Sequence, residues 1–523
     1  MGMKCPACGG YLEFDIESQK LKCTYCGSFQ DPQKYNLKNE ADRQSVQKRE
    51  SAEQISVDVY SCKNCGAELC APNEQVVAFC MYCGGQATLL RKAASIRKPV
   101  GIIPFEISKK KVCELYSKKI DEFPFVPRSF KKSEFLEGFR GIYIPYWKFS
   151  VKVNSYISIK GAGTRSKYGI YEASERYDVK AWCVGSIDSG TYDASEAFDD
   201  TIAFAISPYK EASIIPFNEA YLSGFYADMA TVEPNAYDYV LREDFPKIAQ
   251  SEIRKHLNGI EPDIKEVKSQ IKLQKMEAET FLFPVWFLTW RKGKRVCYSV
   301  MNGQSGELSI DLPVDYMRFF RYAIVMSFIV VNLMDLLPVF IIPFKVATAS
   351  SFLLYFSSFI FNRELKKICQ IETHYFDVGS SLRKNKELKE TSTGLLVLDV
   401  LHYLAAFLMV IPAFLVTTSE HVLKFFILML SFQLIVFIRQ CKSSFGIKNG
   451  IGIIPAFISL FVQVAGVVVA YNDIQADIYY YDISICCLVA MIINIVTSVF
   501  YMNYLTTRPA PNFYTREGAK NGR

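Results

Sequence analysis

From Phe319 onward, long apolar stretches dominate the chain, and polar segments separate them. Six apolar stretches are each close to the roughly 20 residues that a helix needs to cross the hydrocarbon core of a bilayer. The pattern predicts about six membrane-spanning helices within residues 319–503. For the first two stretches, which are closely joined, one span plus a re-entrant helix is the alternative. The six stretches are residues 319–338, 341–361, 395–417, 422–438, 451–471 and 479–501.

Residues 99–313 mix the two periodicities of regular structure. Apolar residues recur at helical spacing over residues 112–120 and alternate with polar residues over residues 151–159, as in a strand. Near the end of the segment, two strand-like runs flank Lys292-Gly293, which indicates a β-hairpin. We therefore predict an α+β domain, long enough to bury its own core.

Before this domain, one metal-ligand spacing occurs twice. Each copy has two C-x2-C pairs separated by 14 residues, and a glycine follows each pair. Both sulfurs of such a pair lie on one tight turn, where glycine permits the positive φ that the turn needs. Disulfides and a rubredoxin-type iron site are the alternatives, but reduced cytosolic thiols favour a structural zinc ion in each copy. The predicted ligands are Cys5, Cys8, Cys23 and Cys26, then Cys62, Cys65, Cys80 and Cys83.

The spacing divides the amino-terminal segment into two zinc ribbons, residues 1–30 and 59–90. Residues 31–58 between them are charged and nearly free of large apolar side chains, so we interpret them as a linker. The ribbons are expected to be independent, so that replacing Cys23 or Cys80 by Ser should unfold only its own ribbon.

Composition and charge give the expected location. Half of the 523 residues are apolar and the mean hydropathy is +0.10, which indicates several domains including a membrane part. No apolar run precedes Cys5, so the amino terminus is expected in the cytosol. Residues 363–389 and 439–448 are rich in Lys and Arg, whereas residues 472–478 carry only acidic charges. The positive-inside rule therefore places both termini, including a tail over residues 504–523, on the cytosolic side of the inner membrane.

Patterns typical of enzymes and transporters are missing from the sequence. The four histidines have no metal-ligand spacing, and no phosphate-binding loop occurs. Asp193, Asp199 and Asp200 are a candidate divalent-cation site, although helix capping is the more common use of such residues. The polar residues near the middle of the spans are amides, which we interpret as hydrogen bonds between helices rather than a substrate path. These amides are Asn332, Gln433, Gln463 and Asn494.

Zinc ribbons are common in proteins that bind nucleic acids, but the charge of residues 1–98 argues against this function here. The segment holds 13 Lys and Arg against 11 Asp and Glu. Two zinc ions held by eight thiolates would make its net charge negative, whereas phosphate binding requires a basic surface.

Several short motifs of aromatic residues, Pro and Gly are typical of turns and packed strand ends. They are Ile103-Pro104-Phe105, residues 141–147, Asp193-Ala194-Ser195, Phe198-Asp199-Asp200, Pro216-Phe217-Asn218, residues 221–225, Pro284-Val285-Trp286 and residues 302–306. In these motifs and in the second ribbon, the chain resembles bacterial zinc-ribbon membrane proteins, mainly from Firmicutes and Actinobacteria. Such proteins are labelled as transcription-factor-IIB-type zinc-ribbon proteins or replication-restart helicases. The membrane part is similar only in kind, and two ribbons instead of one is a departure.

The resemblance implies membrane anchors for stress proteins of the phage-shock and SPFH-scaffold types. With the patterns above, we expect a multidomain protein with two small β zinc ribbons, a cytosolic α+β domain and a carboxyl-terminal all-α bundle of six transmembrane helices. The expected function is that of a non-enzymatic adaptor that binds two structural zinc ions and recruits cytosolic proteins to the lipid bilayer. The alternatives are a transporter or channel with a regulatory cytosolic domain, and a membrane-tethered nucleic-acid binder.

Overall fold

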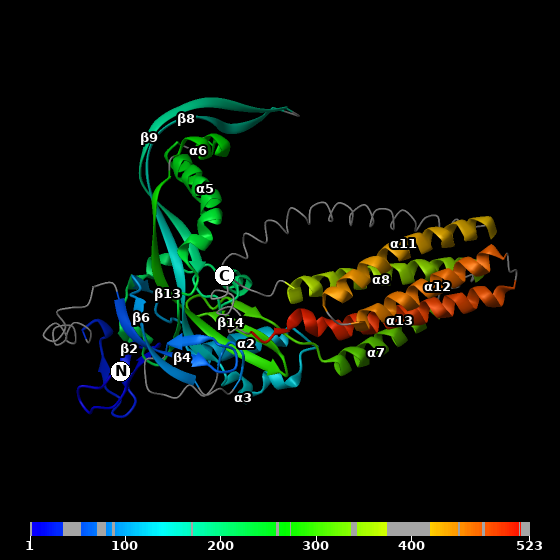
Figure 1. Ribbon diagram of the computed structural model, residues 1–523, viewed down its shortest axis with the longest axis horizontal. Coiled ribbons are helices and arrows are strands. Elements are labelled where there is room, and N and C mark those ends of the chain that lie inside the picture. The colour runs from blue at the N-terminus through cyan, green and yellow to red at the C-terminus, as the bar shows by residue number, and fades with distance from the viewer. Residues whose placement is uncertain are drawn as a thin grey trace, which may run out of the picture.

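The computed structural model describes residues 3–34, 54–70, 80–85, 89–168, 171–257, 261–271, 273–335, 343–373, 419–447, 450–472, 476–511 and 513. Figure 1 shows a sheet-rich part, from one side of which long helices extend. The two four-cysteine clusters lie in sheet regions of the first part.

The first ribbon is a three-stranded antiparallel sheet that is docked on the α+β domain. Its strands are β1 (Leu12–Asp15), β2 (Lys20–Cys23) and β3 (Phe29–Gln30). Leu12, Phe14 and Leu21 are buried against the domain. The backbone N–H of Phe14 donates to the carbonyl of Ser223 over 2.9 Å, and the Phe14 ring lies 5.0 Å from the ring of Tyr221.

The second ribbon is continuous with the main sheet, which corrects the expectation of two independent modules. Its antiparallel strands are β4 (Gln54–Cys62), β5 (Glu68–Cys70) and β6 (Leu89–Arg97). β5 pairs with β11 (Tyr226–Asp228) of the α+β domain. β4 also begins inside the segment that we interpreted as a linker, because pairing with β6 extends it to Gln54.

The described residues form a 13-stranded mixed sheet whose main path runs β10-β7-β13-β8-β11-β5-β4-β6. β13 and β14 form the predicted hairpin, and Gly293 in its turn has φ +61°. The remaining strands are β7 (Gly101–Ile102), β8 (Arg140–Tyr168), β9 (Tyr171–Asp193), β10 (Ile215–Pro216), β12 (Glu261–Pro262), β13 (Leu273–Lys292), β14 (Arg295–Asn302), β15 (Leu308–Ile310) and β16 (Arg508–Pro509).

Helices cover parts of this sheet. The apolar face predicted over residues 112–120 is confirmed in α2, where Val112, Tyr116 and Ile120 are buried. The predicted strand over residues 151–159 is confirmed within β8. The helices of the α+β domain are α2 (Lys109–Asp121), α3 (Ser133–Leu136), α4 (Asp200–Ala205), α5 (Asp238–His256) and α6 (Ile264–Gln270), with short 3-10 turns at Arg128–Lys131, Glu211–Ser213, Glu219–Leu222 and Pro234–Tyr237.

Several of the short motifs that carry the family resemblance meet in one aromatic core. The Phe105 ring stacks on Phe225 at 4.4 Å and meets Trp286 edge-on at 5.2 Å. Gly141 and Gly303 permit this packing, because a Cβ at either position would lie within 2.6 Å of an atom of a Phe ring. These residues therefore have a packing role, as their types indicate.

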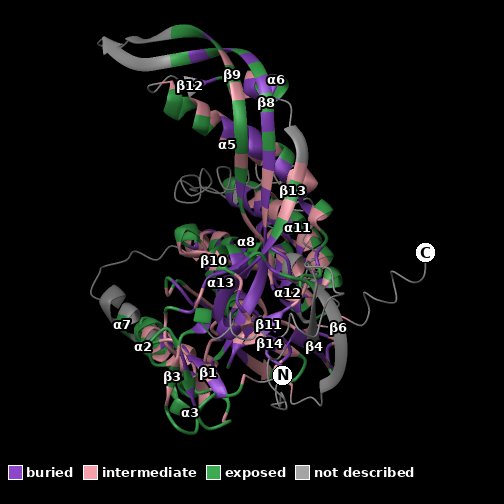
Figure 2. Ribbon diagram, turned by 90° about the vertical axis from the view of Figure 1, so that its left-hand side faces the viewer, coloured by how far each residue is buried: buried purple, intermediate pink, exposed green. Residues whose placement is uncertain are grey.

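β8 and β9 together form a long hairpin that projects from the domain (Figure 1). α5 and α6 pack against one of its faces, where Phe245 and Val267 join the same buried cluster as Val151 and Val179. In Figure 2 the colours along β8 alternate between buried and exposed.

Four described helices are long and apolar enough to cross a membrane: α8 (Pro343–Thr373), α11 (Ser419–Gly446), α12 (Ile453–Tyr471) and α13 (Asp477–Thr506). The first predicted stretch forms α7 (Tyr316–Asp335), which is not among these four. Residues 395–417 lie outside the described residues. The predicted count of six spans is therefore not confirmed.

Polar side chains join the helices of the bundle. Gln463 and Ser351 exchange hydrogen bonds of 2.7 and 3.0 Å between α12 and α8. The amide of Asn494 on α13 donates to the hydroxyls of Ser358 and Ser459 over 3.0 Å. The interpretation of these two amides as contacts between helices is confirmed.

The segment after α13 packs on the α+β domain rather than forming a free tail over its described length. β16 pairs with β14, and the Arg508 guanidinium forms ion pairs with Asp199 and Asp311. The N–H of Phe513 donates to the carbonyl of Cys65 over 2.6 Å. These contacts connect the end of α13 to the second ribbon.

Candidate metal centres

The first cluster is built from two tight turns that carry Cys5 with Cys8 and Cys23 with Cys26. In each turn the N–H of the glycine after the pair, Gly9 or Gly27, donates to the carbonyl of the first cysteine, over 2.8 and 3.0 Å. Both glycines have φ above +70°, as the spacing predicts.

The second cluster repeats this geometry with Cys62, Cys65, Cys80 and Cys83. The N–H groups of Gly66 and Gly84 donate to the carbonyls of Cys62 and Cys80 over 2.7 and 2.9 Å, and both glycines again have positive φ. The C-x2-C spacing and the glycine after it therefore predict both turns.

The sulfur positions fit a tetrahedral ion with four thiolate ligands. In each cluster the Sγ atom of every cysteine lies within 4.8 Å of the Sγ atoms of the other three cysteines. The shortest separations are 3.5 and 3.7 Å in the first cluster and 3.7 and 3.8 Å in the second. A metal–sulfur bond of about 2.3 Å in a tetrahedron gives a sulfur–sulfur edge of about 3.8 Å. A disulfide would bring two sulfurs to about 2.05 Å, so the disulfide alternative does not fit.

Neighbouring polar groups contact the sulfurs of both clusters. The hydroxyl of Ser28 lies 3.2 Å from Sγ of Cys5 and 3.1 Å from Sγ of Cys26. These hydrogen bonds lower the pKa of Cys5 to about 6 and also lower the pKa of Cys26, which favours the thiolate form that binds metals. In the second cluster Nδ2 of Asn64 donates to Sγ of Cys83 over 3.2 Å.

The two clusters differ in burial, which the sequence does not indicate. All four cysteines of the second cluster are buried, and they share a core with Phe198 and Val300. In the first cluster Cys5 and Cys23 are buried, whereas Cys8 and Cys26 are exposed. The second centre therefore belongs to the interior of the α+β domain, and the first lies at the surface of the molecule.

A buried carboxylate connects the second cluster to the sheet. Asp228 at the end of β11 accepts hydrogen bonds from the hydroxyls of Tyr82 and Ser195 and from the N–H of Met229. Tyr82 lies inside the Cys80–Cys83 turn, and its carbonyl accepts a hydrogen bond of 2.6 Å from the Tyr298 hydroxyl. Burial raises the pKa of Asp228 to about 6. No local motif marks Asp228, because its partners are distant in the sequence.

The candidate cation site of Asp193, Asp199 and Asp200 is not among the groups with metal-ligand geometry in the described part of the chain. The carboxylate of Asp199 caps α4 by accepting from the N–H groups of Thr201 and Ile202, and it also pairs with Arg508. Capping, the alternative for these aspartates, is thus confirmed for Asp199.

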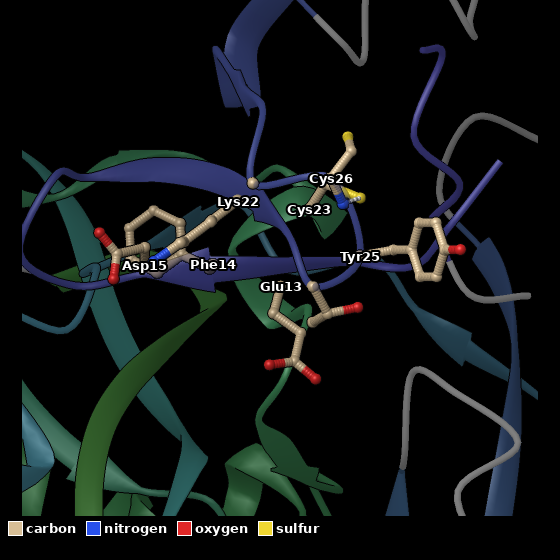
Figure 3. Close-up of a pocket in the computed structure, with 9 residues that line it drawn as sticks. Glu13, Phe14, Asp15, Lys22, Cys23, Tyr25 and Cys26 are labelled. Carbon is tan, nitrogen blue, oxygen red and sulfur yellow. Dashed lines mark hydrogen bonds between the residues drawn. The ribbon is translucent and has the colours of Figure 1, made fainter. Parts of the chain in front are cut away.

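An open hollow lies beside the first cluster (Figure 3). β1 and β2 contribute Glu13, Asp15 and Lys22 to its lining, and the second turn contributes Tyr25 and Cys26. Figure 3 shows the Tyr25 ring extending away from the strands. Its side chain is 85% exposed.

Comparison with known proteins adds one similar chain. The uncharacterized protein YdjG of Bacillus subtilis (strain 168) is 27% identical over 323 residues, which cover 60% of this chain and 89% of that protein. No protein-family model and no solved structure matches the chain. These findings name no family and no activity for the chain.

Proposed function

We propose that this protein is a non-enzymatic, membrane-anchored adaptor that recruits cytosolic proteins to the inner membrane through its first ribbon. The observation that carries the proposal is the way in which this ribbon is mounted. One face is fixed on the α+β domain by Leu12, Phe14 and Leu21, whereas Tyr25 and the exposed cysteines lie at the surface. A rigid, exposed aromatic side chain beside charged groups is a common feature of protein-binding surfaces.

In this proposal both centres hold zinc with a structural role. Four thiolates in a tetrahedron suit zinc, and no coordination position is left for water or substrate. The ion in the first centre would fix the turn that presents Tyr25. The ion in the second centre would stabilise the α+β domain that supports the ribbon.

The four apolar helices would anchor the adaptor, with both termini in the cytosol as the charges of the loops favour. The first candidates for the recruited proteins are scaffold proteins of the SPFH and phage-shock types, because the family resemblance implies them. Glu13, Asp15 and Lys22 around the hollow offer charged groups of both signs to such a partner.

The test compares two variants of the full-length chain, Tyr25→Ala and Phe204→Ala. Both side chains are 85% exposed aromatics, but Phe204 lies on α4, which packs in the buried cluster of the second ribbon and not in that of the first. Tyr25→Ala should reduce in-cell crosslinking to an SPFH-type or phage-shock-type scaffold about thirtyfold, since an aromatic anchor contributes about 2 kcal/mol. Phe204→Ala should leave crosslinking unchanged, and both variants should keep two zinc ions. Equal crosslinking by the two variants would contradict the proposal.

One observation favours the transporter as a second candidate. Gln433 on α11 is fully buried, and within the described part of the chain neither its oxygen nor its nitrogen has a hydrogen-bond partner. An unpaired amide is costly among membrane helices and is tolerated where it meets water or a polar solute. A solute flux in reconstituted vesicles that Gln433→Leu abolishes would support transport, and the absence of flux in the unchanged protein would exclude this candidate.

A further inference from the structure

The hairpin of β8 and β9 has one long edge without a partner strand in the described part of the chain. From Ser150 opposite Asp188 to Ala162 opposite Arg176, the two strands pair without a register shift. We call residues 150–162 and 176–188 the arm. β9 pairs only with β8 among the described strands, so its outer edge presents a row of backbone N–H and C=O groups. Natural sheets protect such edges with bulges, prolines or charged side chains, and the paired part of the arm has no bulge and no proline but carries Arg176, Asp178 and Lys180.

The two faces of the arm differ in their surroundings. α5 and α6 cover the inner face, where residues such as Val153, Ile157 and Val179 are buried. On the outer face Trp182 is 70% exposed and Val184 is 74% exposed, and the Trp182 ring lies 5.5 Å from the ring of Tyr156. An exposed cluster of large apolar side chains on a rigid support indicates a contact surface.

The direction of the arm limits what this surface can contact. In Figure 1 α5 and α6 lie on the side of the arm toward which the long helices extend, so the outer face is turned away from those helices. The hairpin leaves the domain across the direction of the helices and then bends over α5 and α6 (Figure 1). A twofold axis perpendicular to the arm sheet relates two antiparallel β9 edges.

The charges along the edge of β9 limit the registers in which two copies can pair. Pairing centred on Trp182 places Arg176 opposite Asp188 of a second copy, and the Asp188 side chain is 56% exposed although it lies 3.4 Å from Lys148. Centring on Lys180 or on Asp178 would instead place like charges directly opposite each other, which is destabilising. Centring on Val184 would pair Lys180 with Asp188, but it would leave Trp182 opposite Ser186. Only centring on Trp182 also places the Trp182 side chains of the two copies next to each other, and aromatic pairs across strands are stabilising.

We propose that two copies of this chain associate in the membrane by antiparallel pairing of their β9 edges, centred on Trp182. The pairing satisfies the open backbone edge and places Trp182 and Val184 of the two copies side by side as cross-strand neighbours on the outer face. It joins the two arms into one continuous sheet, and it is independent of whether the first ribbon recruits other proteins.

Disulfide crosslinking of the full-length chain in native membranes tests this register. Directly opposed residues of paired strands have Cα atoms about 4.5–5.5 Å apart, within disulfide range, whereas Ser158 on β8 lies one strand farther from the axis. In a Cys183→Ser background, Trp182→Cys should give a disulfide dimer at a yield about tenfold above that of Ser158→Cys. Asp178→Cys and Ser186→Cys should crosslink only when chains carrying each are mixed.

Trp182→Cys removes a proposed contact, so a second test keeps Trp182. A chain with both Lys180→Cys and Val184→Cys serves this purpose, because these two positions lie opposite each other in the proposed register. Strong crosslinking of this chain supports the register. Equal crosslinking at every position of β9 would indicate random collision and overturn the proposal. Absence of dimers in all variants, or crosslinks from Trp182→Cys to a different protein, would also overturn it.

Discussion

Replacing one ligand in each metal centre should have very different consequences. In the second centre Cys80→Ser removes a ligand from a fully buried cluster that shares the core of the α+β domain. Structural zinc binding contributes about 10–16 kcal/mol in zinc-finger peptides. The whole unfolding free energy of a domain is about 5–15 kcal/mol. Loss of this ion therefore removes as much free energy as the domain has, and we expect Cys80→Ser to prevent folding of the α+β domain.

In the first centre Cys26→Ser removes an exposed ligand. Docking of the first ribbon buries Leu12, Phe14 and Leu21, which contribute about 1.5–3 kcal/mol each at most. The first ribbon forms its own three-stranded sheet, and none of its described strands pairs with a strand of the 13-stranded sheet. We therefore expect Cys26→Ser to release the first ribbon and to leave the sheet folded.

The assay is zinc content and hydrogen exchange of the purified full-length chain. Cys26→Ser should bind one zinc ion, lose protection in β1 and β2, and keep protection in β13 and β14. Cys70→Ser is the matched control, because Cys70 is a buried cysteine of β5 outside both clusters, and it should keep two ions. A Cys80→Ser chain with unchanged protection in β13 and β14 would refute this reasoning.

Three further predictions concern other regions. Burial raises the pKa of Asp228 from 3.8 to about 6, so the folded state binds this proton more tightly than the unfolded state. The free energy of unfolding should therefore fall as the pH rises from about 4 to about 6, and Asp228→Asn should flatten this part of a plot of Tm against pH. Arg508→Ala leaves Asp311 without its ion pair and should speed hydrogen exchange in β16 and lower the Tm. If both termini are cytosolic, a cysteine introduced at Asn472 should react with an impermeant reagent in intact cells, and one at Ser381 should not.

The sequence alone predicts the parts of this fold that depend on short-range geometry. The cysteine turns follow from the C-x2-C spacing and the next glycine, because ligand and turn lie within five residues. The β13–β14 hairpin follows from Lys292-Gly293 for the same reason. The apolar face of α2 follows from helical periodicity, which requires no information on distant residues.

The predictions that were wrong concern contacts between distant segments. The spacing of the cysteines does not reveal that β5 pairs with β11, where Leu69 lies opposite Asp228. The burial of the second cluster follows from that pairing, so it could not be predicted either. One local signal was available: Met81 and Tyr82 fill the Cys80–Cys83 turn with large apolar residues, whereas Lys63 and Asn64 in the Cys62–Cys65 turn are polar. Apolar residues at these positions indicate that the Cys80–Cys83 turn faces a hydrophobic core.

The end of the chain gives the second centre a role in the geometry of the whole molecule. α13 ends at Thr506, and Arg295 on β14 donates from Nε to Oγ1 of Thr507 over 2.7 Å. β16 follows, and farther along the chain the ring of Phe513 lies 6.5 Å from the ring of Tyr82 and its N–H donates to the carbonyl of Cys65. A metal ion that fixes Cys65 therefore also fixes the point at which the last apolar helix joins the domain. Loss of that ion would therefore also release the join between the domain and α13. In the proposed adaptor, this connection would hold the first ribbon at a constant distance from the membrane.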